Sequence, residues 1–401
     1  MATFSQNTDL VAVASEVTAG TGIALANLVA DVSFTSSELG VEPASERQKY
    51  ATGDHGSSVS VSGAIPATFK ASSPLSFSGS YALAPSNFVF AKACGHALVE
   101  YRRAISGVTA SGQKVVAIAG TVTGKFTVGQ IVTLKEGSNT ENCEVAIVGT
   151  TGLTMVANLV NDYTGAGFLY TGQALQPVKS ADKSAVTVAR YLVETGASAP
   201  VSVAVRAGGL VGTLDIVGDG IGKPIMLNVD MQGKYIDNTD VANADIPEYS
   251  GVNVSAPDSL LGSALTIGGT AVDVSKFGLS ANNSVTRIEK VSDASGYLCG
   301  LIEKREPVFT CDPIRNTVAT DDAINDAIDA LTGEIVLTTA HFQIRVPKAQ
   351  TVSPKQAQRN GLHSWEKTFE CQRNCTEVGN VAVDTVLPIE CAYEIIMGKR
   401  C

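Results

Sequence analysis

Short runs in which apolar and polar side chains alternate recur along the chain, and glycine-rich turns separate them. Examples are VSVSGAI, FTVGQIVTL, SAVTVARYLV and EIVLTTAHFQIRV. A period of two, rich in Val and Thr, is typical of β-strands with one buried face. Hydrophobic residues make up 44% of the 401 residues and 38 are glycine, which suits a large core with many turns. The sequence therefore predicts a mainly β protein.

Two short stretches have the period of a helix instead. From residues 86–95, SNFVFAKACG, onward, four apolar side chains are expected to share one helical face, those of Phe88, Ala91, Cys94 and Leu98. Ser86 or Asn87 is expected to cap this helix and Gly95 to end it, and Cys94 is expected to be buried rather than reactive. A second helix is predicted between Thr320 and Gly333, with an apolar stripe formed by Ile324, Ala327, Ile328 and Leu331.

The charge of the chain argues against a protein that grips nucleic acid. The formal net charge is −10, and no basic cluster exceeds a pair such as Arg102 and Arg103. Tight binding to phosphate backbones needs several convergent cations. No apolar run reaches the length of a membrane span, and the start MATFSQNTDL lacks the pattern of a secretory signal. The eight cysteines are sparse, so free thiols in a reducing cytosol are expected.

No stretch has the spacing of a catalytic, cofactor or metal site. GDGIGKP at 218–224 fails the spacing of a phosphate-binding loop, so a hairpin turn is expected. Cys371 and Cys375 lack a second pair of zinc ligands. The acidic DNTDVANAD at 237–245 lacks the glycine and closing glutamate of a calcium loop, which favours a solvated loop. His341 alternates with Phe342, which favours a packed histidine over a general base. The sequence therefore predicts no catalytic residues, no cofactor and no enzymatic activity.

Residues 104–175 differ in character from the rest of the chain. They contain five short strand candidates separated by turns: KVVAIAG, FTVGQIVTL, CEVAIVG, LTMVANL and GFLYTG. This pattern predicts a small closed or sandwiched β-module. Its aromatic residues are Phe126, Tyr163, Phe168 and Tyr170.

Several motifs elsewhere occur in an order typical of one family. The strand–turn–helix segment SPLSFSGSYALAPSNFVFAKACG contains Gly79, Pro85, Cys94 and Gly95, and the strand KPIMLNVDMQGKYID contains Gly233 and Tyr235. The segments SKFGLSANNSVTRIEKVSDASGY, LIEKREPVFTCDP and IRVPKAQ follow, and they contain Gly296, Arg305, Pro307 and Pro347. In this order the motifs resemble the tail tube, or major tail, proteins of long-tailed bacteriophages, over residues 10–103 and 176–395.

The resemblance implies a tail tube domain, a β-sandwich or barrel flanked by the two short helices. Its two parts are residues 1–103 and 176–401, and residues 104–175 are then an inserted module on the outer surface. Homohexameric rings are implied, stacked into a tube in the virion tail and made in the host bacterial cytoplasm. The implied partners are other tail proteins: the tape measure, the terminator and the tail tip. DNA is expected to pass through the lumen during ejection without tight binding.

Residues 42–58, EPASERQKYATGDHGSS, are polar and charged without periodicity. The simpler interpretation is a solvated loop. The alternative is an arm that becomes ordered on the neighbouring ring. In that arm Glu46, Arg47 and Lys49 would form salt-sensitive pairs, and Tyr50 would be the apolar anchor.

Two other functions stay open from the sequence. The chain could be a host-surface or carbohydrate-binding β-rich virion protein that acts through the module at 104–175. Surface aromatic residues clustered on the module would favour this function. An enzyme is the weakest alternative, since it needs a pocket of convergent titratable groups that the sequence does not indicate.

Overall fold

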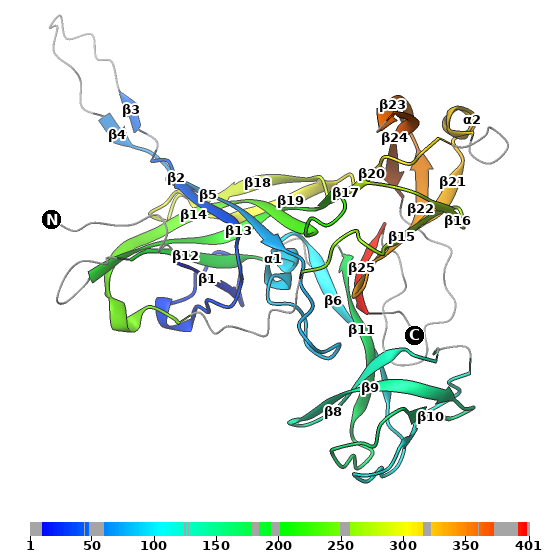
Figure 1. Ribbon diagram of the computed structural model, residues 1–401. Coiled ribbons are helices and arrows are strands. Elements are labelled where there is room, and N and C mark those ends of the chain that lie inside the picture. Colours follow the sequence, from blue (N-terminus) through cyan, green and yellow to red (C-terminus); the bar gives the residue numbers. More distant parts are fainter. Residues whose placement is uncertain are drawn as a thin grey trace, which may run out of the picture.

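The computed structural model describes residues 10–43, 45–47, 60–123, 126, 128–178, 184–193, 201–248, 257–315, 322–359, 361–372 and 392–398. The protein is mainly β, as the alternation predicts, with two short α-helices, α1 (Phe88–Ala93) and α2 (Ala323–Ile328). Figure 1 shows a large antiparallel sheet system from which an arm and a small module project.

Two long strands form the spine of the sheet: β13 (Val201–Asp219) and β14 (Met226–Ala242). On one side β14 pairs with β5 (Pro66–Pro74), which pairs with β2 (Ser36–Val41). On the other side β13 pairs with β12 (Val186–Leu192) along one half and β17 (Lys276–Ser280) along the other, and β12 pairs with β1 (Leu10–Ser15). The expected hairpin turn at 218–224 joins β13 to β14.

The sheet continues from β17 into a second part of the body. The strands there pair in the order β17, β20 (Val308–Cys311), β24 (Leu362–Cys371) and β22 (Phe342–Thr351), and β24 also pairs with β23 (Lys355–Arg359). From β22 one branch leads to β21 (Thr332–Thr338), β15 (Ala264–Ile267) and β16 (Thr270–Val272). The other branch leads to β25 (Glu394–Gly398), β11 (Phe168–Pro177) and β6 (His96–Ala104).

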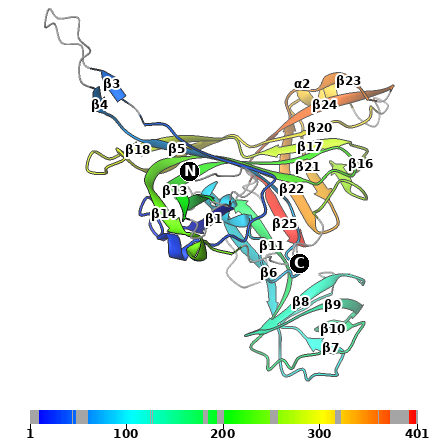
Figure 2. The ribbon, with the colours of Figure 1, turned by 60° about the vertical axis from the view of Figure 1, so that its left-hand side comes forward.

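A separate two-stranded ribbon lies against the spine. It consists of β18 (Asn283–Glu289) and β19 (Tyr297–Arg305), and both strands contact β13 and β14. The approach is close, because a Cβ atom on Gly300 would lie 2.7 Å from the carbonyl oxygen of Gln232. Figure 2 shows the ribbon running along the spine, with its closed end at the far side of the molecule from α2.

The strands of the module are β7 (Val115–Ala117), β8 (Ile131–Glu136), β9 (Asn139–Val148) and β10 (Gly152–Met155). They enclose a hydrophobic cluster separate from that of the body, which includes Val116, Val132, Leu134, Val145, Leu153 and Tyr163. The last predicted strand, GFLYTG, lies at the start of β11, which continues into the body and pairs with β6 and β25. The expected boundary at residue 175 therefore falls inside one continuous strand.

The helix α1 is buried in the main core, with Phe88, Ala91 and Cys94 at 1% exposure or less. Gly95 follows it with φ +79°, the left-handed conformation that the sequence predicts. The capping prediction was wrong. Asn87 occupies the N-cap position without a side-chain cap bond, because the Val89 and Phe90 amides donate to the backbone carbonyl oxygens of Ser86 and Asn87 instead. Leu98 does not belong to the helix but to β6.

The second helix differs more from its prediction. α2 ends at Ile328, and Gly333 belongs to β21. Asp322 caps the helix, since its side chain accepts a hydrogen bond from the Asn325 amide. The apolar stripe does not face the core: Ile324, Ile328 and Leu331 are 46%, 72% and 54% exposed.

The acidic segment at 237–245 is not a loop, as the sequence analysis expected. Residues up to Ala242 continue β14, because they pair with the first residues of β13, from Val201 to Arg206. A 3-10 turn, Asn243–Asp245, follows. The polar side chains lie on an exposed strand end.

Candidate assembly surfaces

The segment at 42–58, for which the sequence left a loop or an arm open, begins as an extension of the pair β2–β5. Beyond Val41 and Ala67 the chain continues into a two-stranded ribbon, β3 (Ser45–Arg47) and β4 (Ser60–Ser62), where Ser45 is opposite Ser62 and Arg47 is opposite Ser60. Figures 1 and 2 both show this ribbon projecting away from the body. Glu46 and Arg47 thus lie on β3, whereas Lys49 and Tyr50 fall outside the described residues.

Four family-motif residues lie on or next to α1. Gly79 has φ +80° in the turn before the helix, and the carbonyl oxygen of Pro85 accepts the Phe88 amide at 3.0 Å. Cys94 is fully buried, and burial raises the pKa of its thiol well above the usual range. Gly95 touches a distant part of the chain, since a Cβ atom on it would lie 2.0 Å from Nη2 of Arg305.

Next to this contact is a buried histidine that the sequence analysis did not single out. The Nδ1 of His96 lies 3.0 Å from the carbonyl oxygen of Ala91, and its Nε2 lies 2.6 Å from the Tyr393 hydroxyl. Burial lowers the pKa of His96 to about 4, and the positive charge of Arg305 acts in the same direction. These groups are enclosed in the core, so the cluster is structural rather than a site open to ligands.

A second group of motif residues lies near the closed end of the ribbon β18–β19. Gly233 opposes a β-bulge in β13, where a Cβ atom would lie 2.6 Å from the carbonyl oxygen of Gly208. Gly296 closes the ribbon turn with φ +76°. Between Gly233 and Tyr235, Lys234 forms an ion pair with Asp293 of that turn, with Nζ and Oδ2 2.5 Å apart. This ion pair therefore holds the segment from Gly233 to Tyr235 against the turn that contains Gly296.

The two prolines of the family pattern have separate structural roles. The carbonyl oxygen of Pro307, in the link from β19 to β20, accepts the Cys371 amide at 2.9 Å. Pro347 lies inside β22 at a bulge, where Pro347 and Lys348 together oppose Glu334 of β21. A proline is tolerated there because a bulge leaves one residue without a ladder hydrogen bond.

The module is fixed to the body by polar contacts as well as by β6 and β11. The amide Nδ2 of Asn142 donates to the carbonyl oxygen of Gly79 at 2.6 Å, and the backbone N–H of Tyr81 donates to Oγ1 of Thr133 at 3.0 Å. Thr133 in turn donates to Oδ1 of Asn142 at 2.6 Å. No local sequence signal predicts that β8 and β9 meet this turn.

The aromatic residues of the module do not form a platform for sugar stacking. Phe126, Tyr163 and Tyr170 are at most 5% exposed, and Tyr163 and Phe126 belong to the module core. Phe168 is partly covered by Arg102, whose guanidinium carbon lies 4.0 Å from the ring centroid. The observation that would favour carbohydrate binding, clustered surface aromatics, is therefore not met on the module.

One carboxylate–imidazole pair has the arrangement of an acid–base site. The Nδ1 of His341 lies 2.6 Å from Oδ1 of the buried Asp258, and the imidazole stacks on Phe77 with ring centroids 4.8 Å apart. The nearby hydroxyl of Thr339 donates to Asp258, not to the imidazole. The pair ties together the ends of β5, β21 and β22, which agrees with a packed histidine.

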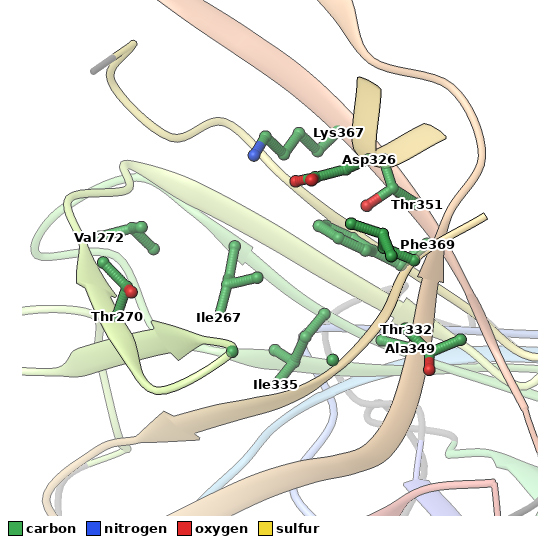
Figure 3. A pocket seen from close by; sticks show the side chains of 13 residues that line it. Ile267, Thr270, Val272, Asp326, Thr332, Ile335, Ala349, Thr351, Lys367 and Phe369 are labelled. Carbon is green, nitrogen blue, oxygen red and sulfur yellow. The ribbon is translucent and has the colours of Figure 1, made fainter. Parts of the chain in front are cut away.

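A cavity of about 210 Å³ opens beside α2. It lies between the hairpin β15–β16, α2 and β24, and its walls include Ile267, Val272, Ile335 and Phe369 (Figure 3). Asp326 of α2 and Lys367 of β24 lie on the same side of it (Figure 3).

Two strands have an open edge within the described residues. β16, at the edge of the cavity, pairs only with β15, and β2, at the base of the arm, pairs only with β5. Open strand edges of this kind are surfaces at which another chain can add.

Within the described ranges, no three His, Cys, Asp or Glu side chains come together so that they could hold a metal ion. The helices α1 and α2 have six residues each, and no described helix has the length and apolarity to cross a membrane. No protein-family model matches this sequence, and a search of curated proteins finds no relative.

Proposed function

We propose that this chain is the structural subunit of a bacteriophage tail tube, and that it assembles as hexameric rings that stack into a conduit for DNA. The observation that carries the proposal is the arm β3–β4. A two-stranded ribbon is marginally stable alone in water, so one that leaves the body fits a role in contacting another subunit. The order of the sequence motifs supports the same role.

In this role the chain works by packing, with no catalytic step. The partners are other copies of the chain and the tape measure, terminator and tail tip proteins, all in the virion tail after synthesis in the host bacterial cytoplasm. DNA crosses the lumen without tight binding, which suits a chain with a net charge of −10.

Electron microscopy of the purified chain in negative stain tests the proposal directly. We expect six-fold rings or tubes, whose fraction in sedimentation grows with protein concentration. A chain that stays monomeric over a wide concentration range, even with tail initiator proteins present, would rule the proposal out.

The arm gives a second, independent test. We expect its backbone amides to exchange hydrogen quickly in the monomer and slowly in the tube, because stacking would order it. Tyr50→Ala should weaken stacking, whereas Leu362→Ala, a change at a half-exposed side chain of β24, should not. Fast exchange of the arm in both states, with Tyr50→Ala stacking normally, would leave only a solvated loop.

A further inference from the structure

We propose that Val291 of one subunit inserts into the cavity beside α2 of a second copy of this chain, and that this contact joins neighbouring subunits within a ring. The inference rests on the proposed tube function and specifies the surfaces that meet. It concerns contacts within a ring, whereas the arm concerns contacts between rings.

Val291 is the most exposed large apolar residue of the described chain, with its full surface in solvent at 102%. It lies in the turn that joins β18 to β19, and this turn is well fixed. The Lys290 amide donates to the carbonyl oxygen of Gly296, and the Gly296 amide donates to that of Asp293, both at 2.9 Å. A valine held out on a preformed turn loses little conformational freedom on binding.

The ion pair with Lys234 holds the same turn from the body side. Asp293 is partly buried, which by itself would raise the pKa of its carboxyl group. Hydrogen bonds from Lys234 and Ser295 outweigh burial and lower that pKa to about 2. The turn that presents Val291 is therefore locked to β14 at neutral pH.

The cavity beside α2 has the matching character. Ile267, Val272 and Phe369 form its apolar wall (Figure 3). Leu331, which is 54% exposed, also lines it, and polar side chains such as Thr270 and Lys367 complete the lining. With about 210 Å³ of open volume it can take a branched apolar side chain. An apolar side chain seated in such a pocket removes the surfaces of both partners from water, which is the usual form of an interface hot spot.

The positions of Val291 and the cavity exclude a contact between them within one chain. Figures 1 and 2 place the closed end of β18–β19 and α2 at opposite ends of the body, so they cannot meet within one chain. A contact between two different patches of identical subunits repeats head to tail and closes into a ring when the rotation allows it.

The charges beside the two features also match. Lys290 precedes Val291 in the turn. The segment from residue 322 to 329, DAINDAID, carries three aspartates and no basic residue. One of them, Asp326, lines the cavity together with Lys367 of β24, so the charges around the cavity are negative in excess rather than only negative. Opposite charges next to an apolar contact favour the correct partner and the correct register.

Paired cysteines test the contact in the full-length chain. Thr270 is exposed and lines the cavity, where Figure 3 labels it, so we combine Val291→Cys with Thr270→Cys. Mild oxidation of the assembled double variant should give a ladder of covalent oligomers, up to the number of subunits in a ring, that reductant reverses. The wild-type chain and each single variant control for the eight native cysteines and should give no such ladder.

A charged side chain in place of Val291 should weaken the same contact. Val291→Asp should raise the concentration needed for half-assembly at least about tenfold, because it places a carboxylate against the apolar wall of Ile267, Val272 and Phe369 and near the like charge of Asp326. Val108→Asp changes a module valine that is 77% exposed and should stay within about twofold of wild type. If wild type forms rings while Val291→Asp assembles normally and the double variant gives no ladder, this contact is refuted and the tube function stands. If wild type forms no rings and the double variant gives no ladder, both are refuted.

Discussion

His96 is expected to make the folded state sensitive to pH below 6.5. The ring is 1% exposed. The carbonyl oxygen of Ala91 can only accept a hydrogen bond, so the proton of the neutral ring lies on Nδ1, and Nε2 accepts from the Tyr393 hydroxyl. Burial, together with the positive charge of Arg305, lowers the pKa of His96 from 6.5 to about 4. A proton on Nε2 would need Tyr393 to turn its hydroxyl away.

The size of the effect follows from proton linkage. As the pH falls below 6.5 the unfolded chain takes up a proton at His96, whereas the folded chain does not until about pH 4. Because the unfolded state binds more protons in this window, the free energy of unfolding decreases as the pH falls. The difference between the two pKa values, at about 1.4 kcal/mol per unit, corresponds to about 3 kcal/mol. That is a large part of the ~5–15 kcal/mol by which a typical domain is stable.

Urea unfolding between pH 7.5 and 4.5 measures this loss. Trp365 is the single tryptophan of the sequence and is 3% exposed, so its fluorescence reports unfolding. His96→Gln removes the titrating group. Its free energy of unfolding should therefore fall by about 3 kcal/mol less than that of wild type between pH 7.5 and 4.5. His363→Gln, at an exposed histidine, should keep the wild-type slope. Equal slopes for wild type and His96→Gln would refute the reasoning.

Three further predictions concern the body, the module and the lumen. Gly95→Ala should destabilise by about 2–4 kcal/mol in urea, because its φ is left-handed and its Cβ would meet the buried Ile302 as well as Arg305, whereas Gly79→Ala, with nothing within 4 Å, should cost about 1–2 kcal/mol from backbone strain alone. Replacing residues 105–167 with a short Gly/Ser turn should leave a folded body that still assembles, because Ala104 and Phe168 are opposite each other in β6 and β11; an unfolded product by circular dichroism would contradict this. Assembled tubes should not bind short duplex DNA at moderate salt, and tight, salt-sensitive binding in a filter assay would contradict the conduit.

Local patterns predicted the strands well, because each strand buries one face and so shows alternation. The pattern fails where pairing changes it. In β9 a bulge at Ala146 places Val145 inside the module and leaves Ile147 exposed, although the two are two residues apart. The acidic end of β14 became a strand because β13 is long enough to pair with it. Such pairing depends on distant residues that a local window does not contain.

The second helix also shows that a local pattern does not contain tertiary contacts. The period of Ile324, Ile328 and Leu331 predicted a helix between Thr320 and Gly333 and found α2, but a period does not specify what lies opposite. No described element of the chain buries that stripe.

The candidate surfaces were only partly predictable. The polar segment at 42–58 favoured a solvated loop and left an arm open as the alternative. The contact of Gly95 with Arg305, the Lys234–Asp293 pair and the exposed Val291 each depend on tertiary structure and leave no signal in the sequence.

The attachment of the module through β6 and β11 has a mechanical consequence. The chain enters the module from the end of β6 and leaves it at the start of β11, and these two ends are paired with each other. Tension on the module therefore runs along both strands. β11 is joined to β25 by four residue pairs and β6 is joined to β11 by nine. Tension along the strand axis loads the β11–β25 ladder in shear, so its hydrogen bonds carry the force together. Peeling would break them one at a time. The junction is thus a strong tether, and a pull on the module is transmitted through β25 into β22 and the second half of the body.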